Sequence, residues 1–205
     1  MAILRQIPKV LKFIPGKAQD LRAYFLSMQY WLAGSEENIE SLFCYLLSRY
    51  SSLHNSSKVE IKSPVEYPET GLYHPDIPKK ITENISEIPF AKHSIGTVGL
   101  LLMRSYVLSG DTAHYDQVIR SLEAQGLNVI PTFAAGLDAR PAINKYFVQN
   151  AKASIDTFLS LTGFSLVGGP AYNSSKAAEE ALAALDVPYI AAHAIELSLI
   201  HISEP

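Results

Sequence analysis

Cysteine is almost absent from this chain of 205 residues, which holds a single one, Cys44. A lone thiol excludes an internal disulfide and any metal site built from several cysteines. Cys44 falls on the apolar face of a predicted helix, and free cysteine in such a setting is usually a buried, unreactive side chain. We interpret it in that way.

A strong charge of one sign is also absent. The chain has 17 Lys and Arg against 20 Asp and Glu, a net charge of −3, and its basic residues form no cluster. This excludes the basic surface typical of proteins that bind DNA or RNA. No apolar run is long enough to span a bilayer, so we predict no membrane span. The start, MAILRQIPKVLKF, lacks the long apolar stretch and cleavage site of a secretory signal.

Several patterns that carry chemistry are missing as well. Neither Gly-x-x-x-x-Gly-Lys-Ser/Thr nor Gly-x-Gly-x-x-Gly occurs, so we predict no ATP site and no dinucleotide site in this chain. No two histidines stand four residues apart on a helix, and no carboxylate pair is placed for acid and base catalysis. We therefore predict no metal site and no catalytic residue within these residues.

The second half of the chain alternates between strand and helix patterns. Val98–Met103 is a continuous apolar run, which is typical of a parallel strand buried on both faces, and Leu127–Phe133 is the second strand that we predict. A helix capped by Asp111 or Thr112 lies between them and ends before Gly126. Later segments repeat the pattern: a short helix at 142–148, a strand at 155–161, an Ala-rich helix at 174–185 and a strand at 187–192. The fold class that we predict is α/β, a doubly wound, flavodoxin-like or Rossmann-like parallel sheet of about four strands with flanking helices.

The first half has a different character. Ala18–Ala33 and the segment after Ser35 are amphipathic helices, and because only Gly34 and Ser35 join them we expect an antiparallel hairpin. Residues 51–94 are rich in Ser, Asn, Pro and Lys, which predicts a long irregular connector with a short helix near 81–85. The predicted division is a helical hairpin at 1–50, a connector at 51–94 and an α/β domain at 95–195.

The last residues do not fit the rest. Residues 196–205, ELSLIHISEP, resemble translated adapter or vector sequence, and our hypothesis is that they are not native. Sequencing the source DNA across this junction tests the hypothesis, and an intact reading frame in an independent isolate would refute it.

Candidate binding residues lie where parallel strands end, because ligands of such folds sit at the carboxyl ends of the strands. After the first strand we expect a polar loop at 104–111, where a cation and a helix amino terminus suit an anion. Small and polar residues follow the third strand, and a histidine beside Tyr73 is the most notable residue of the connector. The candidates are Arg104, Ser105, His114, Thr162, Gly163, Gly168, Gly169 and His74.

Structural explanations compete for each of these residues. Arg104 can pair with a neighbouring carboxylate, and His114 can pack on the surface. The pair Gly168 and Gly169 can form a tight turn, and a single histidine is more often structural than a ligand, because a site needs several convergent groups. A histidine at the end of the fourth strand, His193, belongs to the same class.

Several segments resemble one family. MRSYVLSGDTAHYDQVIRSLEAQG, IPTFAAGLD, SLTGFSLVGGPA and LDVPYI are similar, in order and spacing, to the large H subunit of magnesium chelatase and its cousin, the large subunit of cobaltochelatase. The resemblance runs from about residue 4 to about residue 192. Those subunits are far longer, so it implies a fragment from the amino-terminal side of such a subunit.

The resemblance implies a function for the parent protein. It would bind protoporphyrin IX in the cytoplasm or plastid stroma and, with the ATPase-type I and D subunits, insert Mg²⁺ during chlorophyll or bacteriochlorophyll synthesis. ATP would sit on the partner subunits, and this fragment would bind no cofactor and be inactive alone. Arg104 and the following helix could hold a porphyrin carboxylate. Two alternatives stay open: a cobaltochelatase subunit acting on a corrin precursor, and a structural docking module of the complex.

Overall fold

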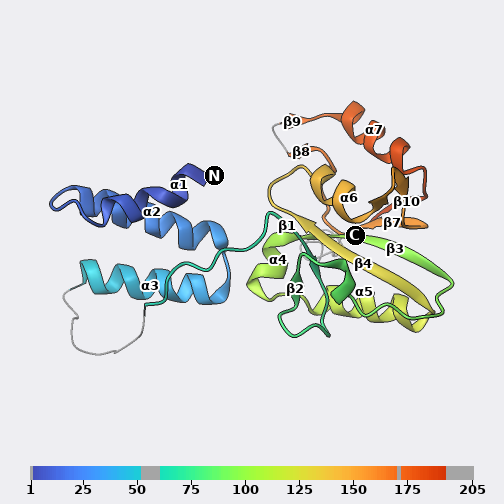
Figure 1. Cartoon of the computed structure of the whole chain (residues 1–205), viewed down its shortest axis with the longest axis horizontal. Helices are drawn as coiled ribbons and strands as arrows, with labels where there is room; N and C mark the ends of the chain where they lie inside the picture. Colours follow the sequence, from blue (N-terminus) through green and yellow to red (C-terminus); the bar gives the residue numbers. More distant parts are fainter. Residues whose placement is uncertain (1, 52–60, 170–171, 193–205) are drawn as a thin grey trace, which may run out of the picture. The chain divides into compact units, whose positions relative to one another are not determined.

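The computed structural model describes residues 2–51, 61–169 and 172–192, and these divide into two compact units. The helical unit comprises residues 1–67 with 108–110, and the sheet unit comprises 68–107 with 111–205. Each is described by itself below (Figure 1). The division predicted from sequence at 50, 94 and 195 stays a prediction.

The helical unit contains three helices, α1 (Ala2–Leu11), α2 (Ala18–Ala33) and α3 (Glu36–Tyr50). The turn between the last two is as predicted. Gly34 adopts φ +65° after α2, a left-handed conformation that costs little without a Cβ, and the Ser35 hydroxyl accepts a hydrogen bond from the Asn38 N–H to cap α3.

An extended segment, residues 61–67, packs along this hairpin. Tyr30 donates to the Lys62 carbonyl at 2.6 Å. Asn38, which is buried, donates to the Val65 carbonyl at 3.0 Å and accepts from the Val65 N–H at 2.9 Å. The side-chain amide of Asn38 thus makes the two hydrogen bonds that a neighbouring strand would otherwise make with the backbone of this segment. These bonds explain why a polar side chain is buried inside the helical unit.

The sheet unit is built on one six-stranded sheet of order β10-β7-β3-β4-β1-β2. Strands β10, β7, β3 and β4 are parallel. At one side of the sheet, β1 pairs antiparallel with β4, and β2 pairs antiparallel with β1. The predicted α/β fold with a parallel sheet and flanking helices is confirmed. Its elements are β1 (Thr70–Tyr73), β2 (Ile81–Thr82), η1 (Ile85–Glu87), β3 (Gly96–Met103), α4 (Arg104–Ser109), α5 (Ala113–Ala124), β4 (Leu127–Ala134), α6 (Arg140–Tyr146), β5 (Val148–Gln149), β6 (Lys152–Ala153), β7 (Thr157–Ser160), β8 (Gly168–Gly169), β9 (Tyr172–Asn173), α7 (Ser175–Leu185) and β10 (Tyr189–Ala191).

The two central strands are buried on both faces. Leu100 and Leu102 of β3 belong to a core with α5, whereas Leu101, between them, belongs to a second core with α6 and α7. Neighbouring strand residues point to opposite faces, so helices cover the sheet from both sides, as Figure 1 shows for α5 against α6 and α7. This arrangement accounts for the continuous apolar runs in the sequence.

The connector prediction was wrong for part of its length. Residues 70–73 form β1 beside β4, residues 81–82 form β2, and the expected helix near 81–85 is a three-residue 3₁₀ turn at 85–87. Strand β1, TGLY, is short and has prolines close to it in the sequence, so its residue pattern does not distinguish a strand from a loop. Its pairing with β4 comes from the tertiary fold.

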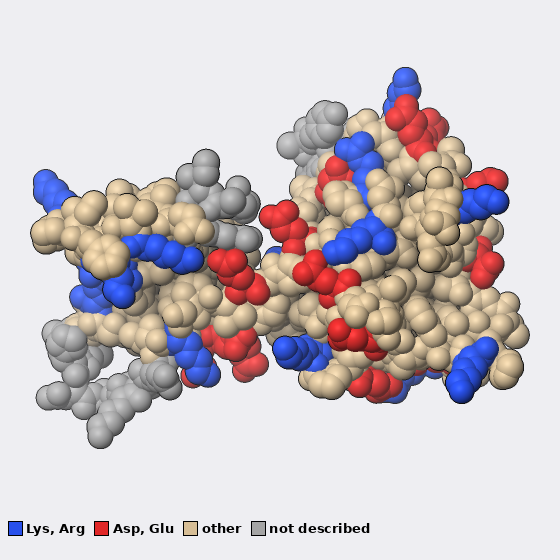
Figure 2. All heavy atoms as spheres, viewed as in Figure 1, with Lys and Arg blue, Asp and Glu red and all other residues tan. Residues whose placement is uncertain are grey.

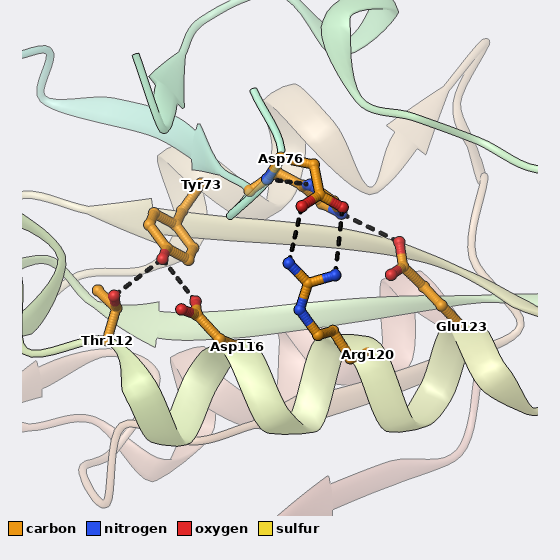
Figure 3. Close-up of polar contacts among 7 residues, drawn as sticks. Tyr73, Asp76, Thr112, Asp116, Arg120 and Glu123 are labelled. Carbon is orange, nitrogen blue, oxygen red and sulfur yellow. Dashed lines mark hydrogen bonds and ion pairs between the residues drawn. The ribbon is translucent and has the colours of Figure 1, made fainter. Parts of the chain in front are cut away.

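A row of polar contacts attaches the β1–β2 turn to one side of α5 (Figure 3). The Tyr73 hydroxyl lies 2.9 Å from Thr112 Oγ1 and 2.5 Å from Asp116 Oδ1. One and two turns further along the helix, Arg120 pairs with Asp76 at 2.7 Å and Glu123 with His74 at 3.0 Å. The helix residues stand three or four apart, so they form a single stripe facing the turn.

Glycine allows close packing at the centre of the sheet. A Cβ added at Gly99 in β3 would lie 2.7 Å from Ile155 Cδ1 and 2.9 Å from Phe147 Cζ, and both side chains are buried. We expect Gly99→Ala to lower the free energy of unfolding by about 1–3 kcal/mol, because the surrounding core has no room for a methyl group.

Urea unfolding of the wild type and the variant measures this effect. Gly96→Ala is the matched control in the same strand, because its nearest contact would be the Asp156 carboxylate, at 3.3 Å. Equal loss in the two variants would contradict the packing that we describe.

The Tyr73 contacts predict a pH dependence. Burial, followed by the hydrogen bond to Asp116, raises the pKa of Tyr73 to about 12 from an ordinary value of about 10. Above about pH 10 the unfolded phenol loses its proton while the folded one keeps it, so the free energy of unfolding falls as pH rises. Relative to Tyr73→Phe, the wild type should be more stable at pH 9 and lose that advantage between about pH 10 and about pH 12. A difference that does not change with pH would contradict the assignment.

Candidate functional site

The order of the parallel strands defines a switch point. The chain passes from β3 to β4 on one side and returns to β7 on the other side of β3. Loops after β3 and β7 therefore diverge, and in open α/β sheets ligands bind in the crevice at this position, beyond the carboxyl ends of the strands. We call the residues that follow β3, β4 and β7 the carboxyl edge: 104–105, 135–138 and 161–168.

The predicted strand ends do meet at this edge. Met103 pairs with Ala134, the Leu161 N–H donates to the Leu101 carbonyl at 2.9 Å, and the Ala192 N–H donates to the Ser160 carbonyl at 2.8 Å. The expectation that parallel strands would present their carboxyl ends together is confirmed.

Residues 161–168 cross the end of β3. They begin at β7 and end beside the loop after β4, where the Gly168 N–H donates to the Leu137 carbonyl at 2.8 Å. Because β3 lies between β7 and β4, the segment passes over the carboxyl end of β3. Leu166 and Val167 are buried in the core with α6, so the segment is fixed by packing on that side of the sheet.

Arg104 stands at the first position after β3. Its Nε donates to the Pro68 carbonyl at 3.2 Å, so the guanidinium extends toward the start of β1. Ser105 is exposed beside it. The prediction of a polar loop at 104–111 was wrong. Residues 104–109 form α4 instead, because the side chains of Val107 and Leu108 are buried.

The prediction of a cap at the start of α5 was correct for the position of the residue and wrong for its hydrogen bond. Thr112 is the N-cap residue of α5, yet its side chain makes no capping hydrogen bond. It contacts Tyr73 instead. Asp111 is exposed.

A second arginine lies near the loop after β4. Arg140 contacts both carboxylate oxygens of Asp138, with Nε 2.9 Å from Oδ1 and Nη2 2.7 Å from Oδ2. This pairing lowers the pKa of the Asp138 carboxyl, so the carboxylate stays ionised. Neither residue was predicted from the sequence, although a bidentate pair two positions apart at a strand end is a recognisable signal.

The small residues shape the segment after β7. Thr162 Oγ1 lies 3.1 Å from Ser160 Oγ and accepts from the Phe164 N–H at 3.3 Å, which forms a tight turn around Gly163 at φ +68°. Gly168 and Gly169 form β8, which pairs with β9. Four predicted candidates thus lie along one segment. A turn accounts for Gly163, whereas Gly168 and Gly169 are strand residues.

The histidines lie apart from this segment. The His114 ring packs 3.9 Å from the Tyr115 ring and 5.4 Å from the Tyr106 ring, between α4 and α5. His193 lies outside the described residues.

His74 is fully buried, and both of its ring nitrogens are engaged. Nδ1 accepts from the Asp76 N–H at 3.2 Å, which assigns the proton to Nε2, 3.0 Å from Glu123. Glu123 is in the last turn of α5, at the opposite end of the strands from Arg104. The structure therefore does not bring His74 together with the other candidates.

Two exposed apolar side chains at the carboxyl edge were also missed. Leu137 follows β4 and Phe164 follows β7, and each exposes nearly half of its surface. Loop residues of this kind carry no periodicity, so sequence alone gives no reason to choose them. Together with Arg104 they give this edge both apolar and cationic groups.

A cavity of about 330 Å³ lies at the opposite, amino-terminal edge of the sheet. It opens beside the first residues of β3 and β4, and Lys145, a cationic side chain in its lining, pairs with Glu83 at 2.8 Å. Its lining residues are Ile85, Phe90, Thr97, Asn128, Ile130, Lys145, Tyr146, Val148, Gln149 and Ser154.

Within residues 2–51, 61–169 and 172–192, no three His, Cys, Asp or Glu side chains gather in a group that could hold a metal ion. In the same ranges, no helix is both long enough and apolar enough to cross a membrane.

Comparison with known proteins gives two family matches. Residues 28–200 match the model of the family described as CobN/Magnesium Chelatase. Residues 1–25 match a second model, described as Domain of unknown function (DUF3479). The boundary between the two matches falls inside α2.

Curated relatives match nearly the whole chain. The H subunit of magnesium chelatase from Cereibacter sphaeroides is 59% identical over 196 residues, which is 96% of this chain and 16% of the relative. The chloroplastic ChlH subunit of magnesium chelatase from Oryza sativa subsp. indica is 37% identical over 206 residues, 94% of this chain and 15% of the relative. The chain spans about one sixth of the length of these relatives.

A solved structure shares the fold. The catalytic subunit of cobaltochelatase from Mycobacterium tuberculosis superposes with a TM-score of 0.54 and 20% identity, over 83% of this chain and 13% of that one. The family match over most of the chain and the 59% identity agree with the resemblance inferred from the sequence motifs. The chain belongs to the CobN/magnesium chelatase family.

Proposed function

We propose that this chain is a region of the H subunit of magnesium chelatase, and that its carboxyl edge contacts the tetrapyrrole. The observation that carries the first part is the 59% identity to the H subunit of a bacterial magnesium chelatase across 96% of the chain. The parent protein would bind protoporphyrin IX and insert Mg²⁺, with ATP hydrolysed by the I and D partner subunits. Mg²⁺ is a substrate here, and this region would hold no cofactor.

The chemistry of the carboxyl edge supports the second part. A porphyrin has a flat apolar ring and two propionate carboxylates. Exposed Leu137 and Phe164 offer apolar surface, and Arg104 offers a guanidinium, which binds carboxylates well. Thr162 and Ser105 add hydroxyl groups that can donate to the same carboxylates.

The similar proteins favour the magnesium enzyme over the cobaltochelatase alternative. The cobaltochelatase neighbour is 20% identical and supports the fold only. The relatives at 59% and 37% identity are both named as magnesium-chelatase subunits. We place the parent protein in the cytoplasm of a bacterium or in the stroma of a plastid.

The second candidate is a docking module that contacts other domains and not the porphyrin. It is favoured by the large apolar side chains exposed on α2 and α3, which are typical of an interaction surface.

Transplanting the chain tests the proposed parent activity. In the H subunit of Cereibacter sphaeroides the aligned region is replaced by the matching 196 residues of this chain, and Mg²⁺ insertion into protoporphyrin is assayed with the I and D subunits and ATP. We expect the chimera to retain most of the activity. The corresponding region of the cobaltochelatase subunit is the control, and it should not support the reaction. A folded but inactive chimera would contradict the proposal.

The Arg104 contact predicts a change in porphyrin affinity. Arg104→Ala should weaken binding of protoporphyrin IX to the 205-residue chain about tenfold or more, because a hydrogen bond between charged groups contributes about 1.5–3 kcal/mol. The shift of the porphyrin absorption band during titration measures the affinity.

Two further variants complete that experiment. Arg104→Lys keeps the charge and should lose less affinity, whereas Lys152→Ala removes an exposed cation at the other edge of the sheet and should change nothing. Equal affinities for the wild type and Arg104→Ala, or equal losses with Lys152→Ala, would favour the docking module.

A further inference from the structure

Strand β10 lies at one edge of the sheet. Within the described residues it pairs with β7 alone. The Pro188 carbonyl accepts a hydrogen bond from β7 at 2.9 Å, and the Ala192 N–H donates one to β7 at 2.8 Å. Successive residues of a strand direct their backbone groups to alternate sides, so the N–H and C=O groups of Tyr189 and Ala191 point away from β7. The outer side of β10 therefore presents backbone groups that can pair with a further strand.

One row of side chains shows where the layer formed by α5 ends. Leu100 of β3, Leu159 of β7 and Ile190 of β10 lie opposite one another in register, on the face of the sheet that α5 covers. Leu100 is fully buried, Leu159 is partly buried, and Ile190 exposes 53% of its surface. Helix α5 thus covers the centre of the sheet and leaves its β10 side open. We call the outer side of β10, together with Ile190, the β10 edge.

The opposite face of the same strands is covered. Phe158 and Tyr189, also opposite one another in register, pack in the core with α6 and α7, and their ring centroids lie 5.1 Å apart. Phe158 is fully buried. Parallel strands are normally buried on both faces, so a β10 strand covered on one face only indicates a missing layer on the other.

The two edges of the sheet differ in their charged residues. At the other edge, β2 is flanked by the exposed Lys80 and Glu83, and charges beside an edge strand discourage pairing with another strand. Charged side chains of both signs are spread over the visible face of the sheet unit (Figure 2). The strand Tyr189–Ala191 has none. Edge β10 therefore lacks the protection that β2 has.

The order of the connections indicates what pairs with β10. From β3 to β4 the chain crosses by α5 on one face, and from β4 through β7 to β10 it moves in the opposite direction with α6 and α7 on the other face. Both directions are consistent with right-handed crossovers. The strands β4, β3, β7 and β10 occupy the first four places of the flavodoxin-like order 2-1-3-4-5. A next step in the same direction would place a parallel strand on the outer side of β10, and a helix returning on the α5 face would cover Ile190.

We propose that the β10 edge is an intramolecular docking surface for a fifth parallel strand and the helix after it, both from the part of the H subunit that follows residue 192. The strand would bond to the outward backbone groups of Tyr189 and Ala191, and the helix would bury Ile190. The inference rests on the proposed function, because it needs a longer parent subunit, and the matched region is 16% of the H subunit from Cereibacter sphaeroides. The loop after the added strand would extend the carboxyl edge by one further strand end.

Hydrogen exchange in the chimera described above tests the proposal. The backbone amides of residues 189–191 should exchange about tenfold or more slowly in the full-length chimera than in the 205-residue chain, because strand pairing protects the outward N–H groups. Residues 81–82, in the other edge strand, are the control and should exchange equally in both proteins. Equal exchange of β10 in the two proteins would overturn the proposal. Chelatase activity is a separate readout, so an active chimera with an unprotected β10 would leave the proposed function intact.

Photo-crosslinking identifies the occupant. A benzoylphenylalanine in place of Ile190 in the chimera should form adducts with the same polypeptide, in the sequence on the carboxyl-terminal side of the transplanted region. Adducts confined to other regions, or adducts between two copies of the subunit, would overturn the assignment.

A charged variant completes the test. Ile190→Lys should leave the thermal midpoint of the 205-residue chain nearly unchanged, because the side chain is half exposed there. In the chimera the same change should raise the exchange of residues 189–191 to the rate seen in the 205-residue chain. Ile95→Lys, at an isoleucine that is 82% exposed before β3, is the matched control and should not change the exchange of β10. Unchanged protection of β10 in the Ile190→Lys chimera would count against the docking surface.

Discussion

Burial of β3 and β4 on both faces is the constraint on which the rest of the sheet unit depends. Strands that are apolar at consecutive positions need a helical layer on each side, and parallel strands joined by helices satisfy that need. Helix α5 covers one face, and α6 and α7 cover the other. The return of the chain to β7 creates the switch point, and the switch point brings the loops after β3 and β7 to one edge.

Apolar packing and polar contacts stabilise different parts of the sheet unit. Close approach of Phe147 and Ile155 to Gly99 sets the spacing of one helical layer. The stripe of polar residues on α5 holds the β1–β2 turn, and both ring nitrogens of the buried histidine there are engaged. A histidine held in this way has no free nitrogen for a metal or a substrate, so the most conspicuous histidine of the sequence is explained by structure.

The parallel strands, their flanking helices and the helical hairpin could be predicted from the sequence because each has a local signal. Val98–Met103 is a continuous apolar run, and Ser35 caps α3 as its position indicates. Strand β1 could not be predicted, because four residues that pair with β4 by tertiary contact carry no period of their own. Arg104 was correctly placed at a strand end, but α4 was missed because a six-residue helix is too short for a reliable pattern. Exposed loop residues at the carboxyl edge were missed because they give no signal. The family resemblance, in contrast, depended on motifs spread along the chain, and the comparisons confirm it.

The two units contribute differently to the proposed role. The sheet unit offers an edge with cationic, hydroxyl and apolar groups, and the helical unit offers apolar side chains exposed on α2 and α3. The central claim is that the tetrapyrrole meets this chain at the carboxyl edge. The most direct test is a titration of the isotope-labelled chain with protoporphyrin IX, followed by amide resonances in NMR spectra. We expect the shifts to concentrate at the carboxyl edge, at Arg104, Ser105, Thr162, Gly163 and Phe164. Shifts confined to the cavity at the amino-terminal edge, around Lys145, Gln149 and Ser154, or no shifts at all, would contradict the claim.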